Sequence, residues 1–168
     1  MTAQSAGAAL VTAACFWGGW KRRQWYVCRR RTLSAFCHAF ARMEAELSCG
    51  DTDTWMLVAL LEQGQAGRFF RTLSRRRGEL ESFPFAALWK DALAGQHYPL
   101  KEEETALLER AGQVLGRYDG RTQAFLLSQL RRELEGMLEN ARREEQRMGR
   151  TVVILGLSLG LGISVLLI

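Results

Sequence analysis

Residues 120–150, GRTQAFLLSQLRRELEGMLENARREEQRMGR, decide the fold of this chain of 168 residues. Apolar side chains recur in this stretch at steps of three and four residues: Leu127, Leu130, Leu134, Met137 or Leu138, and Ala141. Such spacing places them along one side of a helix, as in the seam of a coiled coil or a helical bundle. The sequence therefore predicts a long helix, and between Arg143 and Thr151 only Gly149 interrupts its continuation.

The same helical spacing recurs upstream and predicts five shorter helices. We expect them to begin at Thr32, at Thr52, before Phe69, at Ser82–Pro84 and after Pro99, and to end near Gly50, Gly64, Arg75–Gly78, Gly95 and Gly116. The charge run at Glu102, Glu103 and Glu104 suits the positive end of a helix dipole. No alternating strand pattern competes with these helices. The predicted fold class is all-α, an antiparallel bundle of about six helices with short connections, flanked by N-terminal and C-terminal transmembrane helices.

The C-terminal flank is residues 151–168, TVVILGLSLGLGISVLLI, which carry no charge. As a helix this segment would measure about 27 Å, enough for the hydrocarbon core of a bilayer. Basic residues come directly before it: Arg142, Arg143, Arg147 and Arg150. Basic flanks lie on the cytoplasmic side of a membrane. The sequence therefore predicts a transmembrane helix over 151–168 whose C-terminal end is outside the cytoplasm.

The N-terminal end repeats this arrangement in reverse. An apolar segment over residues 3–20 is followed by Lys21, Arg22 and Arg23, and no basic side chain precedes it. A secretory signal peptide has its positive charge before the apolar region, so that interpretation is disfavoured. We expect a transmembrane helix over 3–20, a cytoplasmic helical bundle over 21–150, and both termini outside the cytoplasm.

The net charge of +5 fits a membrane surface better than a nucleic acid. Each Lys or Arg near an anionic bilayer contributes roughly 1 kcal/mol of attraction, whereas the chain shows no basic stripe with aromatics. The four cysteines lack paired spacing and are expected to be reduced thiols. Cys37 stands next to His38, but two further ligands are missing nearby, so no metal site is predicted. No cofactor is predicted either.

One motif resembles a catalytic one. Gly156-Leu157-Ser158-Leu159-Gly160 matches the G-x-S-x-G of a nucleophile elbow, which requires a strand-to-helix turn and a nearby histidine. Here the serine falls in a predicted membrane span, and the two histidines, His38 and His97, fall in the predicted cytoplasmic bundle. We favour a packing role for the small residues Gly156, Ser158, Gly160 and Gly162, which let two spans approach closely. An intramembrane serine hydrolase using Ser158 is kept as an alternative.

A family resemblance emerges from the segment Leu115-Gly116-Arg117-Tyr118-Asp119, with Gln123 four residues further on. It resembles an L-G-x-S-D-x-x-x-Q signature. Met43–Leu47 before Gly50, Trp89, the Arg147-Met148 pair and the Gly-rich terminal segment fit the same pattern. Together, over nearly the whole chain, they resemble the stage III sporulation protein AB family. Tyr118 departs from the serine of the signature, and Val153 stands where a glycine is common.

The resemblance implies a non-enzymatic assembly component of the channel complex that the mother cell builds against the forespore. The protein would be anchored in the mother-cell membrane that faces the forespore, with the bulk of the chain in the cytoplasm. The implied partners are other stage III sporulation proteins, namely a secretion-type ATPase and inner-membrane components such as a platform protein. Membrane lipids are further expected partners, whereas nucleic acids and small-molecule substrates are not expected.

Alternating helix directions predict where a partner would bind. The connections at 48–52, 75–83 and 116–121 should lie at the membrane-distal end, and those at 62–67 and 94–100 should face the membrane. The predicted partner-binding residues at the distal end are Gly116, Tyr118, Asp119, Gln123, Arg75, Arg76 and Arg77. Two alternatives remain open: Asp119 caps the last helix, and the three arginines form a solvated turn. A lipid-responsive membrane adaptor is the other alternative function.

Overall fold

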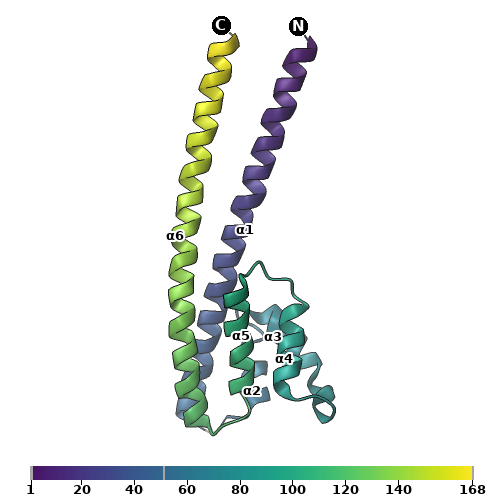
Figure 1. Ribbon diagram of the computed structural model, residues 1–168. Coiled ribbons are helices and arrows are strands. Elements are labelled where there is room, and N and C mark those ends of the chain that lie inside the picture. The colour runs from purple at the N-terminus through teal and green to yellow at the C-terminus, as the bar shows by residue number, and fades with distance from the viewer. Residues whose placement is uncertain (1, 51, 168) are drawn as a thin grey trace. The chain divides into compact units, whose positions relative to one another are not determined.

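The computed structural model describes the backbone of residues 2–50 and 52–167, and the side chains of residues 17, 21–50, 52–79 and 82–148. Within these limits the chain is helical throughout its regular structure, and the all-α prediction is confirmed (Figure 1). The elements are α1 (Thr2–Cys49), α2 (Thr54–Leu61), α3 (Gly67–Arg75), the 3-10 helix η1 (Arg77–Glu81), α4 (Phe85–Ala94), α5 (Glu102–Val114) and α6 (Gly120–Leu167).

These elements fall into two compact units. Unit 1 comprises the chain up to Arg30 and from Asn140 onward, which is the beginning of α1 and the end of α6. Unit 2 comprises Arg31–Glu139, which contains the rest of the two long helices together with α2 to α5 and η1. The predicted boundaries at residues 20 and 150 depend on membrane insertion and stay a prediction.

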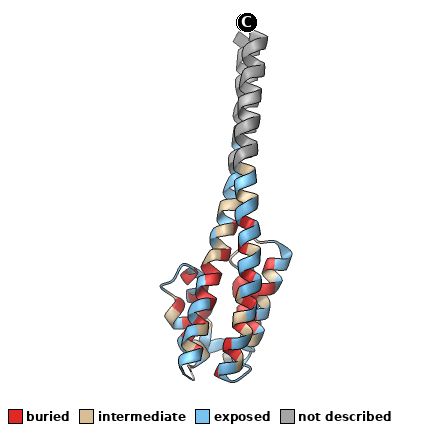
Figure 2. Ribbon diagram, turned by 90° about the vertical axis from the view of Figure 1, so that its left-hand side faces the viewer, coloured by how far each residue is buried: buried red, intermediate tan, exposed pale blue. Residues whose placement is uncertain are grey.

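Unit 2 is built around an apolar core. Figure 2 shows buried residues concentrated on the inner sides of its helices. The largest fully buried side chains are Trp89, Phe36, Phe40, Phe69 and Phe70, and Trp89 donates a hydrogen bond from its Nε1 to the Leu108 carbonyl oxygen at 2.8 Å. The Phe69 and Trp89 rings meet edge to face with centroids 4.7 Å apart, a preferred aromatic geometry. The indole ring therefore packs in the apolar core while its N–H group is hydrogen-bonded.

A glycine allows α5 to lie close against this tryptophan. Gly112 is buried in α5, and a Cβ atom added there would stand only 2.4 Å from Cγ of Trp89. Because an indole ring is rigid, any larger side chain would push α5 away from α4. Gly112 is therefore a packing residue of the core.

The seam predicted for the last helix is confirmed and refined. Leu127, Leu130, Leu134 and Ala141 are all buried. Of the two alternatives at the fourth position, Leu138 is buried whereas Met137 is only half-buried. Leu138 therefore occupies the seam.

Two predicted helix boundaries differ from the structure. Thr32 does not begin a helix, because α1 runs through it without interruption, and residues 21–31 contain neither glycine nor proline. The cap of α2 is Asp53 rather than Thr52, since a carboxylate oxygen of Asp53 accepts the Trp55 backbone N–H at 3.2 Å. The third helix ends at Arg75, within the predicted range, and η1 follows it. Arg76, just before η1, makes an ion pair with Glu79 at 2.7 Å.

Ion pairs join the two helical segments of unit 1. Arg29 of α1 pairs with Glu144 of α6, and Arg30 pairs with Glu145 one residue further along each helix. The Arg29 side chain is only 2% exposed, which makes it a buried charge that the sequence analysis did not foresee. The two ion pairs join consecutive residues of both helices and so fit one register between them.

Among the side chains that the structure describes, no helical stretch is long and apolar enough to cross a membrane. The predicted spans 3–20 and 151–168 lie outside the described side chains, apart from Trp17. The same holds for Arg150 and for the predicted packing residues Gly156, Ser158, Gly160 and Gly162.

Candidate functional site

Three connections gather toward one end of unit 2. In Figure 1 the links from α1 to α2, from α3 to α4 and from α5 to α6 lie toward this end, and the link from α4 to α5 lies toward the opposite one. This is the arrangement expected from alternating helix directions. The end with three connections is opposite the end where residues 31 and 139 lie, and we call it the tip.

The signature loop, residues 115–119, lies at the tip and has a constrained backbone. Gly116 has a φ of +75°, a region that side chains with a Cβ rarely adopt. A Cβ at Gly116 would also come within 3.4 Å of the Thr54 hydroxyl oxygen. The loop therefore runs beside the first residue of α2, and the positive φ is the reason that glycine suits this position.

Gln123 fastens the signature loop to the first turns of α6. Its buried side chain accepts a hydrogen bond from the Gly116 backbone N–H at 3.4 Å through Oε1, and donates one from Nε2 to the Tyr118 carbonyl oxygen. Backbone groups that leave a helix need partners of this kind, because burying them unpaired is costly. One side chain thus serves two backbone groups in the loop.

Asp119 caps α6, as the structural alternative predicts. Its Oδ2 accepts the Thr122 backbone N–H at 3.1 Å, and its carbonyl oxygen accepts the Gln123 N–H at 2.9 Å. The hydrogen bonds from the Thr122 side chain and backbone to the ionised carboxylate lower the pKa of Asp119 below its usual value. The carboxylate also faces the positive end of the α6 dipole.

Comparison with known proteins gives these features a family context. The sequence model of the stage III sporulation protein AB family matches residues 4–168. The chain belongs to this family. A solved structure of a stage III sporulation protein AB is 21% identical, covers 71% of this chain and 98% of its own, and superposes with a TM-score of 0.58. At this identity the likeness shows a shared fold. No curated protein matches the chain.

The signature of the stage III sporulation protein AB family thus has a structural explanation in this member. Gly116 adopts the left-handed backbone conformation that the loop requires, and Asp119 caps α6. Gln123 joins the loop to the helix by hydrogen bonds. Tyr118, which replaces the serine of the signature, is 44% exposed, and the Arg117 guanidinium lies 5.8 Å from the centre of its ring. Of the four loop positions predicted to bind a partner, Gly116, Tyr118 and Asp119 are exposed and Gln123 is buried, and the Tyr118 side chain takes no part in the cap or in the Gln123 hydrogen bonds.

The three predicted arginines lie at the end of α3 and directly after it, and they differ in exposure and in their contacts. Arg75 and Arg77 are exposed. Arg76 is half-buried and binds Glu79 at 2.7 Å and Asp91 of α4 at 3.5 Å, rather than the signature loop. The bond with Glu79 is the main reason that the pKa of Arg76 is raised. Arg76 therefore fixes η1 against α4, and its two neighbours remain at the surface.

Exposed apolar residues at the tip were not predicted: Phe83 in the α3–α4 connection is 52% exposed, and two more lie on helices. Met56 on α2 is 68% exposed and Phe125 on α6 is 63% exposed. Both lie within two turns of the start of their helices, on the side of the tip. Their exposure could have been predicted from their place outside the apolar stripe of each helix. Phe125, for example, falls between the buried positions Ala124 and Leu127 but lies on another face of α6.

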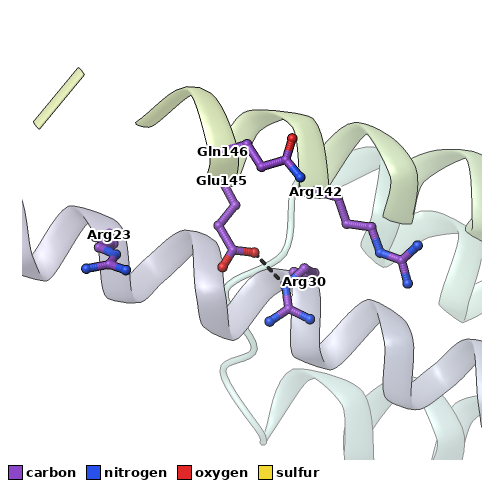
Figure 3. Close-up of a pocket in the computed structure, with 5 residues that line it drawn as sticks. All are labelled: Arg23, Arg30, Arg142, Glu145 and Gln146. Carbon is purple, nitrogen blue, oxygen red and sulfur yellow. Dashed lines mark hydrogen bonds and ion pairs between the residues drawn. The ribbon is translucent and has the colours of Figure 1, made fainter. Parts of the chain in front are cut away.

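The predicted basic flanks belong to unit 1. Lys21, Arg22, Arg23, Arg142, Arg143 and Arg147 are all exposed. Arg23 and Arg142 also line a pocket of about 450 Å³, together with Arg30, Glu145 and Gln146 (Figure 3). The pairing of Arg30 with Glu145 was not predicted, because it joins residues that are far apart in the chain.

The described side chains offer little for catalysis or metal binding. No group of three or more His, Cys, Asp or Glu among them is placed to hold a metal ion. His38 and His97 are both exposed residues of unit 2. Ser158, on which the hydrolase alternative depends, lies outside the described side chains.

Proposed function

We propose that this protein is a non-enzymatic, membrane-anchored assembly component of the channel complex between mother cell and forespore. Membership of the stage III sporulation protein AB family over residues 4–168 supports a role in this stage of sporulation. The uncharged segment 151–168 and the apolar segment 3–20, each with a basic inner flank, support anchoring in the mother-cell membrane. In this proposal the small residues of 156–162 pack the two spans against each other or against a partner's span.

The tip is the proposed docking surface for a cytoplasmic partner, either the ATPase of the same complex or an inner-membrane platform protein. The observation that carries this proposal is the exposure of large apolar side chains, Met56, Tyr118 and Phe125, at one end of unit 2. Exposed aromatic residues are typical anchors of protein interfaces. Gln123 holds the backbone of the loop that carries Tyr118 by a hydrogen bond. Binding a partner there would therefore cost little conformational entropy of the loop. Arg75 and Arg77 add positive charge toward the same end.

Two kinds of tip variant test this proposal. Tyr118→Ala and Phe125→Ser remove exposed side chains, and Arg77→Glu reverses an exposed charge, so none of them should disturb the core. We expect each tagged full-length variant to reach the membrane at the normal level. We expect it to retain less of the ATPase or platform protein on co-purification from sporulating cells, and to lower spore yield.

A matched control is Arg132→Glu, which makes the same charge reversal at an exposed position of α6 away from the tip. It should leave partner retention and spore yield unchanged. Normal retention and spore yield in the tip variants would contradict the docking proposal. A loss shared equally by Arg132→Glu would show that charge alone, rather than the tip, is responsible.

A further inference from the structure

The pocket of unit 1 has a composition suited to phosphate. Its walls are Arg23 and Arg30 from α1, and Arg142, Glu145 and Gln146 from α6. Figure 3 shows that the two helices contribute from opposite sides. The five side chains comprise three guanidinium groups, one carboxylate and one amide, and Glu145 pairs with Arg30 among them, so the set carries a net charge of +2. Guanidinium is always protonated in proteins, and its planar fork of donors matches the oxygen atoms of phosphate.

Glu145 balances the charge of one of the three arginines. Glu145 pairs with Arg30, and both side chains are only partly exposed: Arg30 at 31% and Glu145 at 25%. The pair fixes Arg30 at the wall of the pocket, and its charges cancel to a first approximation. Arg23 lies seven residues before Arg30, or about 10 Å along the same helix, and two turns of α1 therefore present guanidinium groups to the pocket.

The sequence around the pocket points to a lipid as the source of the phosphate. Arg23 follows the apolar segment 3–20 by only a few residues, and Gln146 comes shortly before the uncharged segment 151–168. Trp25 is exposed and lies 5.6 Å from the Arg29 guanidinium, and Trp17 is also exposed. Tryptophan and arginine at the ends of apolar segments are typical of the level of lipid headgroups.

We propose that this pocket binds the phosphate of an anionic phospholipid headgroup, through Arg23, Arg30 and Arg142 and with the amide of Gln146. The volume of about 450 Å³ is of the size that accommodates a small polar ligand. The choice of a lipid rests on the proposed membrane anchoring, whereas the choice of phosphate rests on the arginine composition alone. Glu145 limits the affinity, because it competes with the phosphate for Arg30.

The test uses the full-length protein in an uncharged detergent. Equal amounts of phosphatidylglycerol and phosphatidylcholine are added, and native mass spectrometry measures which lipid stays bound. We expect clear enrichment of phosphatidylglycerol in the wild type. Arg23→Gln with Arg142→Gln should weaken phosphatidylglycerol binding by about 25-fold, at roughly fivefold for each lost charge. Glu145→Gln frees Arg30 and should strengthen binding by about fivefold.

The matched control is Arg42→Gln with Arg132→Gln, which removes the same charge from exposed positions of the same two helices within unit 2. It should leave phosphatidylglycerol binding within about twofold of the wild type. Equal weakening in both double variants, or no strengthening by Glu145→Gln in a protein with a normal melting temperature, would overturn the proposal.

A second arm separates the lipid from free phosphate and from the question of anchoring. Inorganic phosphate at constant ionic strength should displace phosphatidylglycerol only weakly, because the free ion lacks the anchored acyl chains. Tight binding of inorganic phosphate without enrichment of phosphatidylglycerol would overturn the lipid assignment. Carbonate extraction of cell membranes tests anchoring separately. An extracted protein would contradict the proposed function, and an anchored protein without lipid preference would contradict only this inference.

Discussion

Gly112 and Gly136 are both glycines inside helices, but their surroundings differ completely. A Cβ at Gly112 would lie 2.4 Å from Cγ of Trp89, whereas a Cβ at Gly136 would have no neighbour within 4 Å. We expect Gly112→Ala to destabilise the protein by about 1–3 kcal/mol, because the rigid indole cannot yield without moving α4. We expect Gly136→Ala to stabilise it by about 0.5–1 kcal/mol, because alanine is the better helix former.

Thermal unfolding of the two full-length variants in detergent, followed by circular dichroism, measures both changes. The same chemical substitution should shift the melting temperature in opposite directions. Shifts of the same sign would mean that Gly112 does not pack against Trp89 as the structure describes.

Asp119 gives a prediction about pH. Its pKa is lowered in the folded protein by the hydrogen bonds from Thr122, so the ionised carboxylate stabilises the fold above the ordinary pKa of 3.8. This contribution is lost as the pH falls through the lowered pKa, because the carboxylate becomes protonated in the folded state as well. Asp119→Asn keeps a capping oxygen but has no charge to lose.

The melting temperature of the wild type should therefore exceed that of Asp119→Asn near pH 6, and the gap should close toward about pH 2. Differential scanning calorimetry across this range measures the gap. A gap that stays constant with pH would show that the charge of Asp119 contributes nothing to the cap.

Single residues also show what the sequence could reveal. Gly116, Asp119 and Gln123 were picked out through the resemblance to the family signature, and a cap at Asp119 was one of two alternatives, because aspartate is a common N-cap. The hydrogen bonds of Gln123 could not be predicted, since they depend on the path of a loop that is known only from the fold. Arg29 was missed for a related reason: its partner Glu144 is distant in the sequence.

At the scale of helices, the seam of α6 provides a graded prediction. Leu134 is fully buried, whereas Met137 is half-buried one turn away. Leu134→Ala should cost about 2–5 kcal/mol, since it leaves a cavity in the core. Met137→Ala should cost clearly less, because solvent already reaches that side chain. Denaturant unfolding of the two variants measures the difference, and equal costs would contradict the assignment of Leu138 rather than Met137 to the seam.

Helix ends were predictable where glycine or proline marks them. The breaks after Cys49, at Pro84 and near Gly116 follow from backbone preferences that act within a few residues. Thr32 was wrongly expected to begin a helix because threonine is a common cap. A cap is needed only where the preceding backbone leaves the helix, and the residues before Thr32 continue it.

At the scale of the whole molecule, the sequence predicted the helical class and the alternating order of the helices. It did not predict the ion pairs that join α1 to α6 in unit 1, nor the pocket beside them. Periodicity along one helix identifies the face that is buried, but it carries no information about which residue of a distant helix lies opposite. Long-range pairing of charges follows only from the assembled structure.

The last prediction concerns the side of the membrane on which each part of the chain lies. Basic residues follow the segment 3–20 and precede the segment 151–168, and this placement favours a cytoplasmic position for everything between them. A reporter that is active only outside the cytoplasm should therefore be active when fused after Ile168 and inactive when inserted at His97, an exposed residue of the α4–α5 link. A fluorescent reporter that matures only in the cytoplasm should give the opposite pattern at the same two positions. If the His97 fusion were active outside, unit 2 with its tip would face away from the cytoplasm, and a cytoplasmic ATPase would have no access to Tyr118.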